Sequence, residues 1–245
     1  MRILVINPNT TEEMTEDIGR QARRYARPET EIEAVAPAWG PRSIEGHYED
    51  QLAAVATLEV IQEHGSGFDG VVIACFGDPG LHAAREVSPV PVVGIAEAAM
   101  LMACTVAHSF SIVTVLPRIR PMFESMVGLH GLEDRCASIR TTPLSVLDCE
   151  RDPAAAGREI VKAARLAIDE DGAEAICLGC AGMGPLDKTV EAELGVPVLD
   201  GVACAVKLIE SLVDYGLSTS RVAAFKPPEP KEIVGYSPAG ASLPA

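Results

Sequence analysis

Two short apolar segments of the sequence, VVIAC at 71–75 and ICLGC at 176–180, each run into a cysteine that is followed by glycines. Apolar runs that end in glycine-rich turns are typical of buried strands in a parallel sheet. The landmarks around them recur in the same order at near-equal spacing: Pro8, Cys75 and Pro91 in the first half, and Pro117, Cys180 and Pro197 in the second. This pattern predicts an internal duplication, with one α/β unit in each half of the chain.

Strand-like and helix-like segments alternate through the first half. Thr10 and Glu13 form a capping-box pattern that predicts the start of a helix reaching about residue 26. Residues 49–64 have the spacing of a second helix. The expected strands are 2–7, 31–36, 70–75 and 90–95. Because helices alternate with strands, we expect an α/β fold of parallel sheets with helices on both faces.

The duplication predicts two similar Rossmann-like (flavodoxin-like) lobes related by a pseudo-twofold axis. Lobe one takes residues 1–97 together with 205–225, because the helix at about 202–215 is expected to pack back on it; lobe two takes 98–204. The segment 226–245 is rich in proline and is expected to form an irregular tail. Ligands of open parallel sheets bind at the carboxyl ends of the strands, so we expect the active site in the cleft between the lobes.

The composition excludes several classes of partner. The net charge is −15, which argues against nucleic acid and against anionic membrane surfaces. The longest apolar run, at 98–107, is too short to span a membrane, and the N-terminus lacks the apolar segment of a secretory signal. Seven cysteines are an odd number, so reduced thiols in a cytoplasmic protein are expected rather than a disulfide framework.

The two cysteines at the strand ends are the candidates for chemistry. The residues after Cys75 and Cys180 are small, and their backbone N–H groups can lower the pKa of a thiol and hold a developing oxyanion. Two thiols on opposite sides of one carbon suit a two-base racemisation, in which one thiolate removes a proton and the other thiol returns one. We assign Cys104, Cys136, Cys149 and Cys204 to the core, since free cysteine is often a small buried hydrophobe.

Cys177 and Cys180 also form a Cys-x-x-Cys pattern, which is compatible with redox or metal chemistry. Residues three apart on a strand point to opposite faces, and the chain has no second Cys-x-x-Cys and no His-x-x-x-His for zinc. We therefore expect no metal site.

Several polar residues are expected near the thiols. Asn7 to Thr10 end the first strand and can present amides and a helix start to a carbonyl group, or simply make a turn and a cap. Ser43 lies in the loop after the second strand and can bond a substrate carbonyl. Thr114 takes the place of Asn7 in the second half. Asp78 can orient the Cys75 loop, bind a ring N–H, or serve only in the turn.

Five motifs occur in a characteristic order: ILVINPNT at 3–10, GPRSIEGHYED at 40–50, IACFGDPGL at 73–81, LGCAGM at 178–183 and PVLDGVACAVKL at 197–208. Together they resemble the aspartate/glutamate racemase superfamily and, within it, the hydantoin racemase and allantoin racemase branch. The resemblance covers about residues 2 to 212. It implies two α/β lobes, a cofactor-independent reaction, a small-molecule substrate and a homo-oligomer.

The resemblance also implies roles for individual residues. The two bases map onto Cys75 and Cys180, and the substrate contacts onto Asn9, Ser43, Ile44, Thr114, Ala181 and Gly182. Gly77 and Asp78 of the thiol loop complete the expected substrate-binding set. The branch often has Ser or Asp at the position of Gly77 and Thr at that of Val115, so the thiol loop and the ring selectivity are expected to differ here.

The leading hypothesis is a racemase of a hydantoin or allantoin ring. A weakly charged ring also fits the lack of an Arg or Lys clamp for a carboxylate beside either cysteine. A maleate isomerase, which can keep two cysteines, is the nearest alternative, and a one-thiol decarboxylase is disfavoured. A non-catalytic small-molecule binding protein and a thiol-redox or metal protein are alternatives of other classes. The ring substituent, alkyl, aryl or ureido, is left open.

Overall fold

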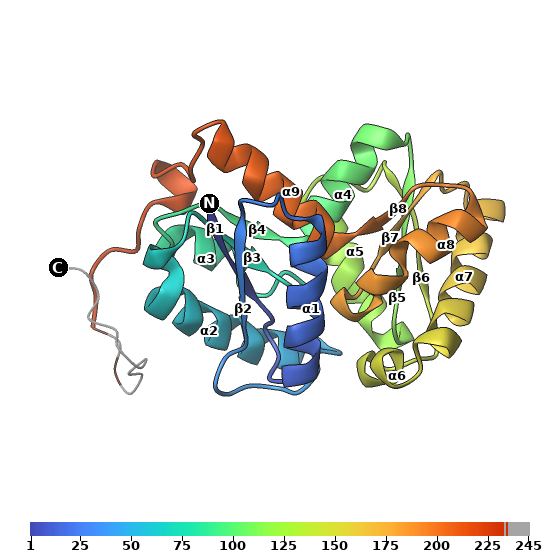
Figure 1. Ribbon diagram of the computed structural model, residues 1–245, viewed down its shortest axis with the longest axis horizontal. Helices are drawn as coiled ribbons and strands as arrows, with labels where there is room; N and C mark the ends of the chain where they lie inside the picture. The colour runs from blue at the N-terminus through green and yellow to red at the C-terminus, as the bar shows by residue number, and fades with distance from the viewer. Residues whose placement is uncertain (233, 235–245) are drawn as a thin grey trace.

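The computed structural model describes residues 1–232 and residue 234, and it contains two four-stranded parallel sheets (Figure 1). The first has the order β2-β1-β3-β4 and the second the order β6-β5-β7-β8. The strands are β1 (Arg2–Ile6), β2 (Glu31–Val35), β3 (Gly70–Ile73), β4 (Val92–Gly94), β5 (Phe110–Thr114), β6 (Cys136–Thr141), β7 (Ala175–Leu178) and β8 (Val198–Asp200). The two-lobe parallel α/β fold expected from the sequence is confirmed.

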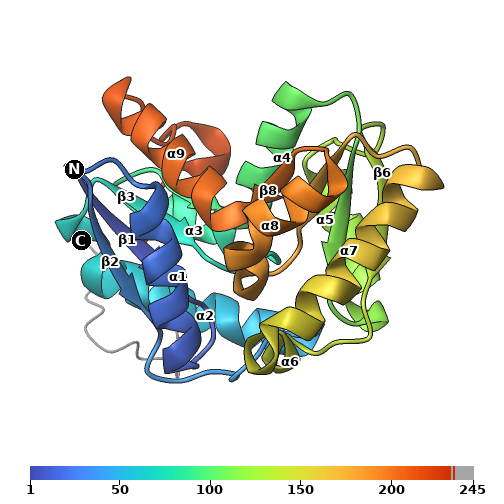
Figure 2. The same cartoon turned by 45° about the vertical axis from the view of Figure 1, so that its right-hand side comes forward.

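Helices flank both sheets (Figures 1 and 2). The α-helices are α1 (Glu12–Tyr25), α2 (His47–His64), α3 (Leu81–Val87), α4 (Ile95–Val106), α5 (Arg120–Leu129), α6 (Val146–Arg151), α7 (Pro153–Asp169), α8 (Asp187–Leu194) and α9 (Gly201–Asp214). Short 3-10 helices are η1 (Gly65–Gly67), η2 (Pro117–Ile119), η3 (Ala181–Leu186) and η4 (Ala223–Phe225). Among the described residues, no helix is long and apolar enough to cross a membrane.

The two sheets bring Cys75 and Cys180 to equivalent positions. In the first sheet, Ile6 of β1 pairs with Ile73 of β3, and the N–H of Ala74 donates to the Ile6 carbonyl at 2.8 Å. In the second sheet, Val113 of β5 pairs with Leu178 of β7, and the N–H of Gly179 donates to the Val113 carbonyl at 2.8 Å. The next residue in each case is the cysteine, so each thiol follows the third strand of its own sheet by the same offset.

The start of α1 differs from the expected capping box. The helix begins at Glu12 after the N-cap Thr11, and no side chain caps it. The hydroxyls of Thr10 and Thr11 donate instead to the carbonyls of Pro41 and Arg42, at 3.4 and 2.7 Å. The prediction that Thr10 and Glu13 form a capping box is therefore wrong, because carbonyl groups of the loop before α2 accept the hydrogen bonds of the threonine hydroxyls. These two hydrogen bonds tie that loop to the segment between β1 and α1.

The last helix of each half packs on the sheet of the other half. Helix α4 follows β4 of the first sheet and contacts β7 and β8 of the second; α9 follows β8 and contacts β3, β4 and α1 (Figure 1). The two helices also pack on each other. The larger of two apolar clusters among the described residues runs through both sheets, and the smaller one lies in the first half alone. The lobe bounds 1–97 with 205–225 and 98–204 stay a prediction. Most of the expected tail lies outside the described residues.

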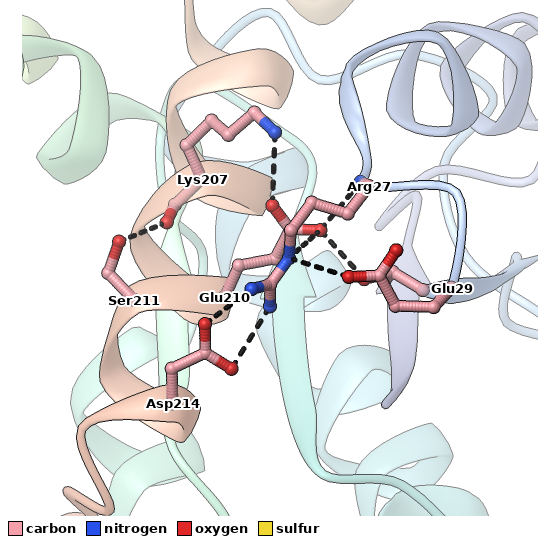
Figure 3. A network of polar contacts seen from close by, with 7 residues as sticks. Arg27, Glu29, Lys207, Glu210, Ser211 and Asp214 are labelled. Atoms are coloured by element: carbon pink, nitrogen blue, oxygen red, sulfur yellow. Dashed lines mark hydrogen bonds and ion pairs between the residues drawn. The ribbon is translucent and has the colours of Figure 1, made fainter.

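A polar network holds α9 on the first lobe (Figure 3). The buried carboxylate of Glu210 accepts hydrogen bonds from the Arg27 N–H at 2.8 Å and from the Thr30 hydroxyl at 2.7 Å. Lys207 contacts its other oxygen at 3.1 Å, and Arg27 also pairs with Asp214. These partners lower the pKa of Glu210 against the opposing effect of its burial. A buried carboxylate with several donors fixes the helix in one position.

Candidate active site

A small cavity of about 30 Å³ lies between the lobes, beyond the carboxyl ends of the strands. Both Cys75 and Cys180 line it. The other lining residues are Asn9, Met14, Ile44, Ala74, Phe76, Gly77, Val115, Ile119, Met122, Val146, Gly179 and Ala181. Among these lining residues the two thiols are the only ionisable side chains, so acid–base chemistry inside the cavity falls to them.

The loop after β3 presents Cys75 to the cavity in a tight turn. The N–H of Asp78 donates to the Cys75 carbonyl at 2.9 Å, and Phe76 reaches across to Phe123 of α5 with ring centroids 5.5 Å apart. Burial raises the pKa of the Cys75 thiol, and the nearby Asp50, Cys180 and Asp78 raise it further. A hydrogen bond from the Gly77 N–H to this thiol acts in the opposite direction.

The loop after β7 presents Cys180 at the start of η3. The N–H of Met183 makes the first hydrogen bond of this helix, to the Cys180 carbonyl at 3.0 Å. The N–H groups of Ala181 and Gly182 come before that first bond, at the start of the helix. Gly179 lets the strand pass close to β5, because a Cβ at this position would lie 2.6 Å from the Cβ of Thr114. The Thr114 hydroxyl donates to the Gly179 carbonyl at 2.8 Å and fixes this loop.

The amide of Asn9 is oriented by its neighbours. Its Oδ1 accepts from the Asn7 amide and from the N–H of Thr11, both at 2.9 Å. The Nδ2 group therefore faces Met14, whose sulfur it contacts at 3.0 Å, on the side where Met14 and Asn9 both line the cavity. Asn9 can donate to a carbonyl oxygen of a ligand bound there.

Asp78 does not line the cavity but lies at the start of α4. Its buried carboxylate accepts from the N–H groups of Ala96 and Glu97, at 3.0 and 2.8 Å, and so caps α4. Gly94 makes room for it, since a Cβ there would lie 2.1 to 2.3 Å from the carboxylate atoms. Burial raises the pKa of Asp78 to about 7, although the two backbone hydrogen bonds oppose this. Asp78 thus links the Cys75 loop to α4.

The structure brings together six of the ten expected site residues at the cavity: Cys75, Cys180, Asn9, Ile44, Gly77 and Ala181. The other four expected residues do not line the cavity: Ser43, Asp78, Thr114 and Gly182. Thr114 is fully buried behind Gly179. The substrate contacts expected of all these residues stay predictions.

The apolar walls of the cavity were not predicted from the sequence. Met14, Ile119, Met122 and Val146 line the cavity, three of them from the second lobe. Apolar residues in helical segments are usually predicted to lie in the hydrophobic core. No signal in the sequence distinguished these cavity-lining side chains from core side chains. The carboxylate of Asp50 in α2, which lies close to Gly77, was not predicted either. A charged residue on a helix is usually expected to face solvent.

Cys177 points away from the cavity. It is fully buried in β7, and burial raises its pKa well above the ordinary value, with Cys204, Cys136 and Cys104 nearby. Cys180 lies at the cavity instead, so the two thiols of the Cys-x-x-Cys pattern face different surroundings. In residues 1–232 and 234, no group of three or more His, Cys, Asp or Glu side chains is arranged to hold a metal ion.

Comparison with known proteins places this chain in one family. The Asp/Glu/Hydantoin racemase family model matches residues 3–209. The chain is 51% identical over 236 residues to a hydantoin racemase of Pseudomonas sp. strain NS671, covering 96% of this chain and 95% of that one. Its fold matches an allantoin racemase from Klebsiella pneumoniae with a TM-score of 0.94, 48% identity and 98% coverage of both chains.

An allantoin racemase from Pseudomonas fluorescens matches equally well in fold, with a TM-score of 0.94 at 47% identity, over 96% of this chain and all of that one. The family model and these relatives span nearly the whole described structure, both thiol loops included. The chain belongs to the Asp/Glu/hydantoin racemase family.

Proposed function

We propose that this protein is a cofactor-independent racemase of a five-membered ureide ring, either a 5-substituted hydantoin or allantoin. The observation that carries the proposal is the pair of thiols, Cys75 and Cys180, which reach one cavity from equivalent positions in two equivalent sheets. The names of relatives at about half identity, hydantoin racemase and allantoin racemase, support the choice of substrate.

The reaction needs one proton to leave a carbon and another to arrive on its opposite face. In one direction the Cys75 thiolate takes the proton from the stereogenic carbon, and the electron pair of the C–H bond moves onto the adjacent carbonyl oxygen. The Cys180 thiol then donates its proton to the other face, and the enolate collapses to the carbonyl. The reverse direction exchanges the two roles, and solvent resets the thiols.

The enolate oxygen requires hydrogen-bond donors. The N–H groups of Ala181 and Gly182 at the start of η3 and the Nδ2 group of Asn9 are the donors that we assign to it and to the second ring carbonyl. The uncharged cavity walls suit a neutral ring. An amino acid substrate would bring a carboxylate and an ammonium group to a cavity whose lining side chains offer neither partner.

Substrate entry requires the cavity walls to separate. The cavity of about 30 Å³ has room for little more than a water molecule, and it is closed across the lobes by a hydrogen bond. Glu45, next to the lining residue Ile44, accepts from the N–H of Val146 at 3.0 Å. We assign this contact to the closed state of the enzyme, in which the site excludes water.

The test is racemisation with solvent exchange. An enantiopure alkyl hydantoin and enantiopure allantoin are incubated separately with the protein in heavy water, beside a protein-free blank. Optical rotation and the proton signal of the ring C–H are followed together. We expect the wild type to racemise at least one ring with exchange, and Cys75→Ser and Cys180→Ser to lose about 100- to 10,000-fold in rate.

Cys177→Ala is the matched control, because this thiol lies close in sequence but outside the cavity. It should retain activity. A redox or metal protein would instead depend on Cys177 as much as on Cys180, and a binding protein would show no exchange in any form. If neither ring is racemised or exchanged, the proposed function is refuted, and maleate becomes the next substrate to test.

A further inference from the structure

The carboxylate of Asp50 has one oxygen without a partner. Asp50 lies near the start of α2, and its Oδ2 accepts from the Gln51 side chain at 3.2 Å. Its Oδ1 is buried and accepts no hydrogen bond from any described residue. A buried acceptor without a donor is unfavourable by the loss of its hydration. A ligand group that donates a hydrogen bond would therefore satisfy this oxygen.

The free oxygen lies at the edge of the active-site cavity. The ideal Cβ position of Gly77 is 2.9 Å from Asp50 Oδ1, 3.2 Å from Met122 Cε and 3.9 Å from Cys75 Sγ. Met122, Gly77 and Cys75 all line the cavity. The absence of a side chain on Gly77 thus leaves a space that Asp50, Met122 and the thiol share.

No described residue donates a hydrogen bond to this oxygen. Met122, which shares the space beside Gly77 with it, is apolar. The charged or titratable groups close to Asp50 are His47 on its own helix and Cys75 in the facing loop. Burial raises the pKa of Asp50, as expected for a carboxylate that lacks donors.

The substrate can supply the donor from the group next to the reacting carbon. This step rests on the proposed function, in which the stereogenic carbon sits at the thiols and its substituent lies beside them. In allantoin the atom bonded to that carbon is a ureido N–H, whereas in an alkyl hydantoin it is a CH₂ group. We propose that Asp50 Oδ1 accepts a hydrogen bond from the ureido N–H of allantoin, and that this contact makes the enzyme select allantoin over alkyl hydantoins.

Two substrates of matched shape test the proposal. The ureido group of allantoin and an isobutyl group have the same number and branching of heavy atoms, so allantoin and isobutyl hydantoin differ in polarity more than in size. Asp50→Leu removes the acceptor, and Asp50→Asn keeps an oxygen but removes the charge. Glu49→Gln is the control, because Glu49 also has a buried oxygen without a hydrogen-bond partner but lies beside Gly46 and Arg118.

In the wild type we expect kcat/KM for allantoin to exceed that for isobutyl hydantoin by about tenfold or more. Asp50→Leu should lower the ratio of kcat/KM for allantoin to kcat/KM for isobutyl hydantoin by about tenfold or more. The ratio is the readout, because removing the Asp50 charge also lowers the pKa of Cys75 and so changes both rates. Asp50→Asn should lower the same ratio several-fold, since a neutral acceptor bonds the ureido N–H more weakly. The control should leave the ratio unchanged. Thermal unfolding shows whether each variant is folded. If Asp50→Leu does not fold, Asp50→Asn alone tests the proposal.

The outcomes separate the two proposals. A parallel loss for both substrates, or no change for either, overturns the role of Asp50 while the racemase function stands. A wild type that racemises isobutyl hydantoin better than allantoin overturns it in the same way. A wild type that racemises neither substrate refutes the proposed function, and the role of Asp50 with it.

Discussion

Gly94 and Asp78 are predicted to be energetically coupled, because one leaves the space that the other fills. A Cβ at Gly94 would lie 2.1 Å from the Asp78 Cγ and 2.3 Å from both carboxylate oxygens. These separations are far below van der Waals contact, and the atoms belong to a side chain that two backbone N–H groups hold in place. Gly94→Ala must therefore eject the carboxylate from the start of α4.

The size of the effect follows from the bonds that are lost. Each buried N–H left without its acceptor costs about 1–3 kcal/mol, and two are lost, so we expect Gly94→Ala to lower the free energy of unfolding by about 2–6 kcal/mol. Asp78→Ala removes the same two hydrogen bonds and should cost about the same, plus a part of the about 1–2 kcal/mol of left-handed strain, because aspartate tolerates the φ of +46° at residue 78 better than alanine does. This strain term is present in both Asp78→Ala backgrounds and cancels in the cycle.

The double variant gives the decisive number. Once the carboxylate is gone, the new Cβ meets none of the three atoms nearest to Gly94, so the two losses should not add. We expect a coupling energy of about 3 kcal/mol from urea unfolding of the four proteins. Gly157→Ala in α7 is the control, because its nearest contacts are Leu186 methyl groups at 4.0 Å, and it should be neutral or stabilising by up to about 1 kcal/mol.

Racemase activity of the same proteins tests the link to the thiol. Because Asp78 fixes the loop that carries Cys75, Gly94→Ala and Asp78→Ala should both reduce kcat more than their residual folding explains under conditions where they remain folded. Additive unfolding energies, or a Gly94→Ala variant as stable and active as the wild type, would refute the assignment of Asp78 as the cap of α4.

Three further predictions concern titration and the helix exchange. The pKa of Asp78 is raised to about 7 by burial, so between about pH 4 and 7 the folded state binds more protons than the unfolded state. As the pH rises over this window, the unfolding free energy of the wild type should therefore fall by up to about 4 kcal/mol relative to that of Asp78→Asn. Urea unfolding at several pH values measures this difference, and a difference that does not change with pH contradicts the raised pKa. Burial also raises the pKa of Cys75, so kcat/KM for the enantiomer deprotonated on that side should rise by about tenfold per pH unit above neutrality, and a flat profile would point to another base. Glu210→Gln weakens the network that docks α9 and should lower the unfolding free energy by about 1–3 kcal/mol without changing the pH–rate profile; an altered profile would mean that the network acts on the thiols.

The sequence predicted the parts of this structure that repeat. The apolar runs before Cys75 and Cys180 and the prolines at matching spacing lead directly to two parallel sheets, which have the same strand order and the same strand-to-thiol offset. Hydrophobic periodicity determines such elements locally, so a single sequence carries enough information for them.

The side-chain roles were harder, because they depend on partners far away in the chain. Asp78 caps a helix that begins at Ile95, and the hydroxyl of Thr114 is taken by Gly179. The hydroxyls of Thr10 and Thr11 bond the carbonyls of Pro41 and Arg42 rather than capping α1. Local capping patterns compete with such tertiary acceptors, and nothing in the short-range sequence shows which wins.

The exchange of α4 and α9 between the sheets also determines how the molecule unfolds. Each sheet is covered by a helix that the other half supplies, as in a dimer whose subunits have traded their last helices and were then joined in one chain. A fragment that ends before α4 or before α9 leaves an apolar sheet face uncovered. The two halves should therefore melt together in one calorimetric transition, and the opening that admits substrate must be a hinge motion about α4 and α9 rather than a separation of independent domains.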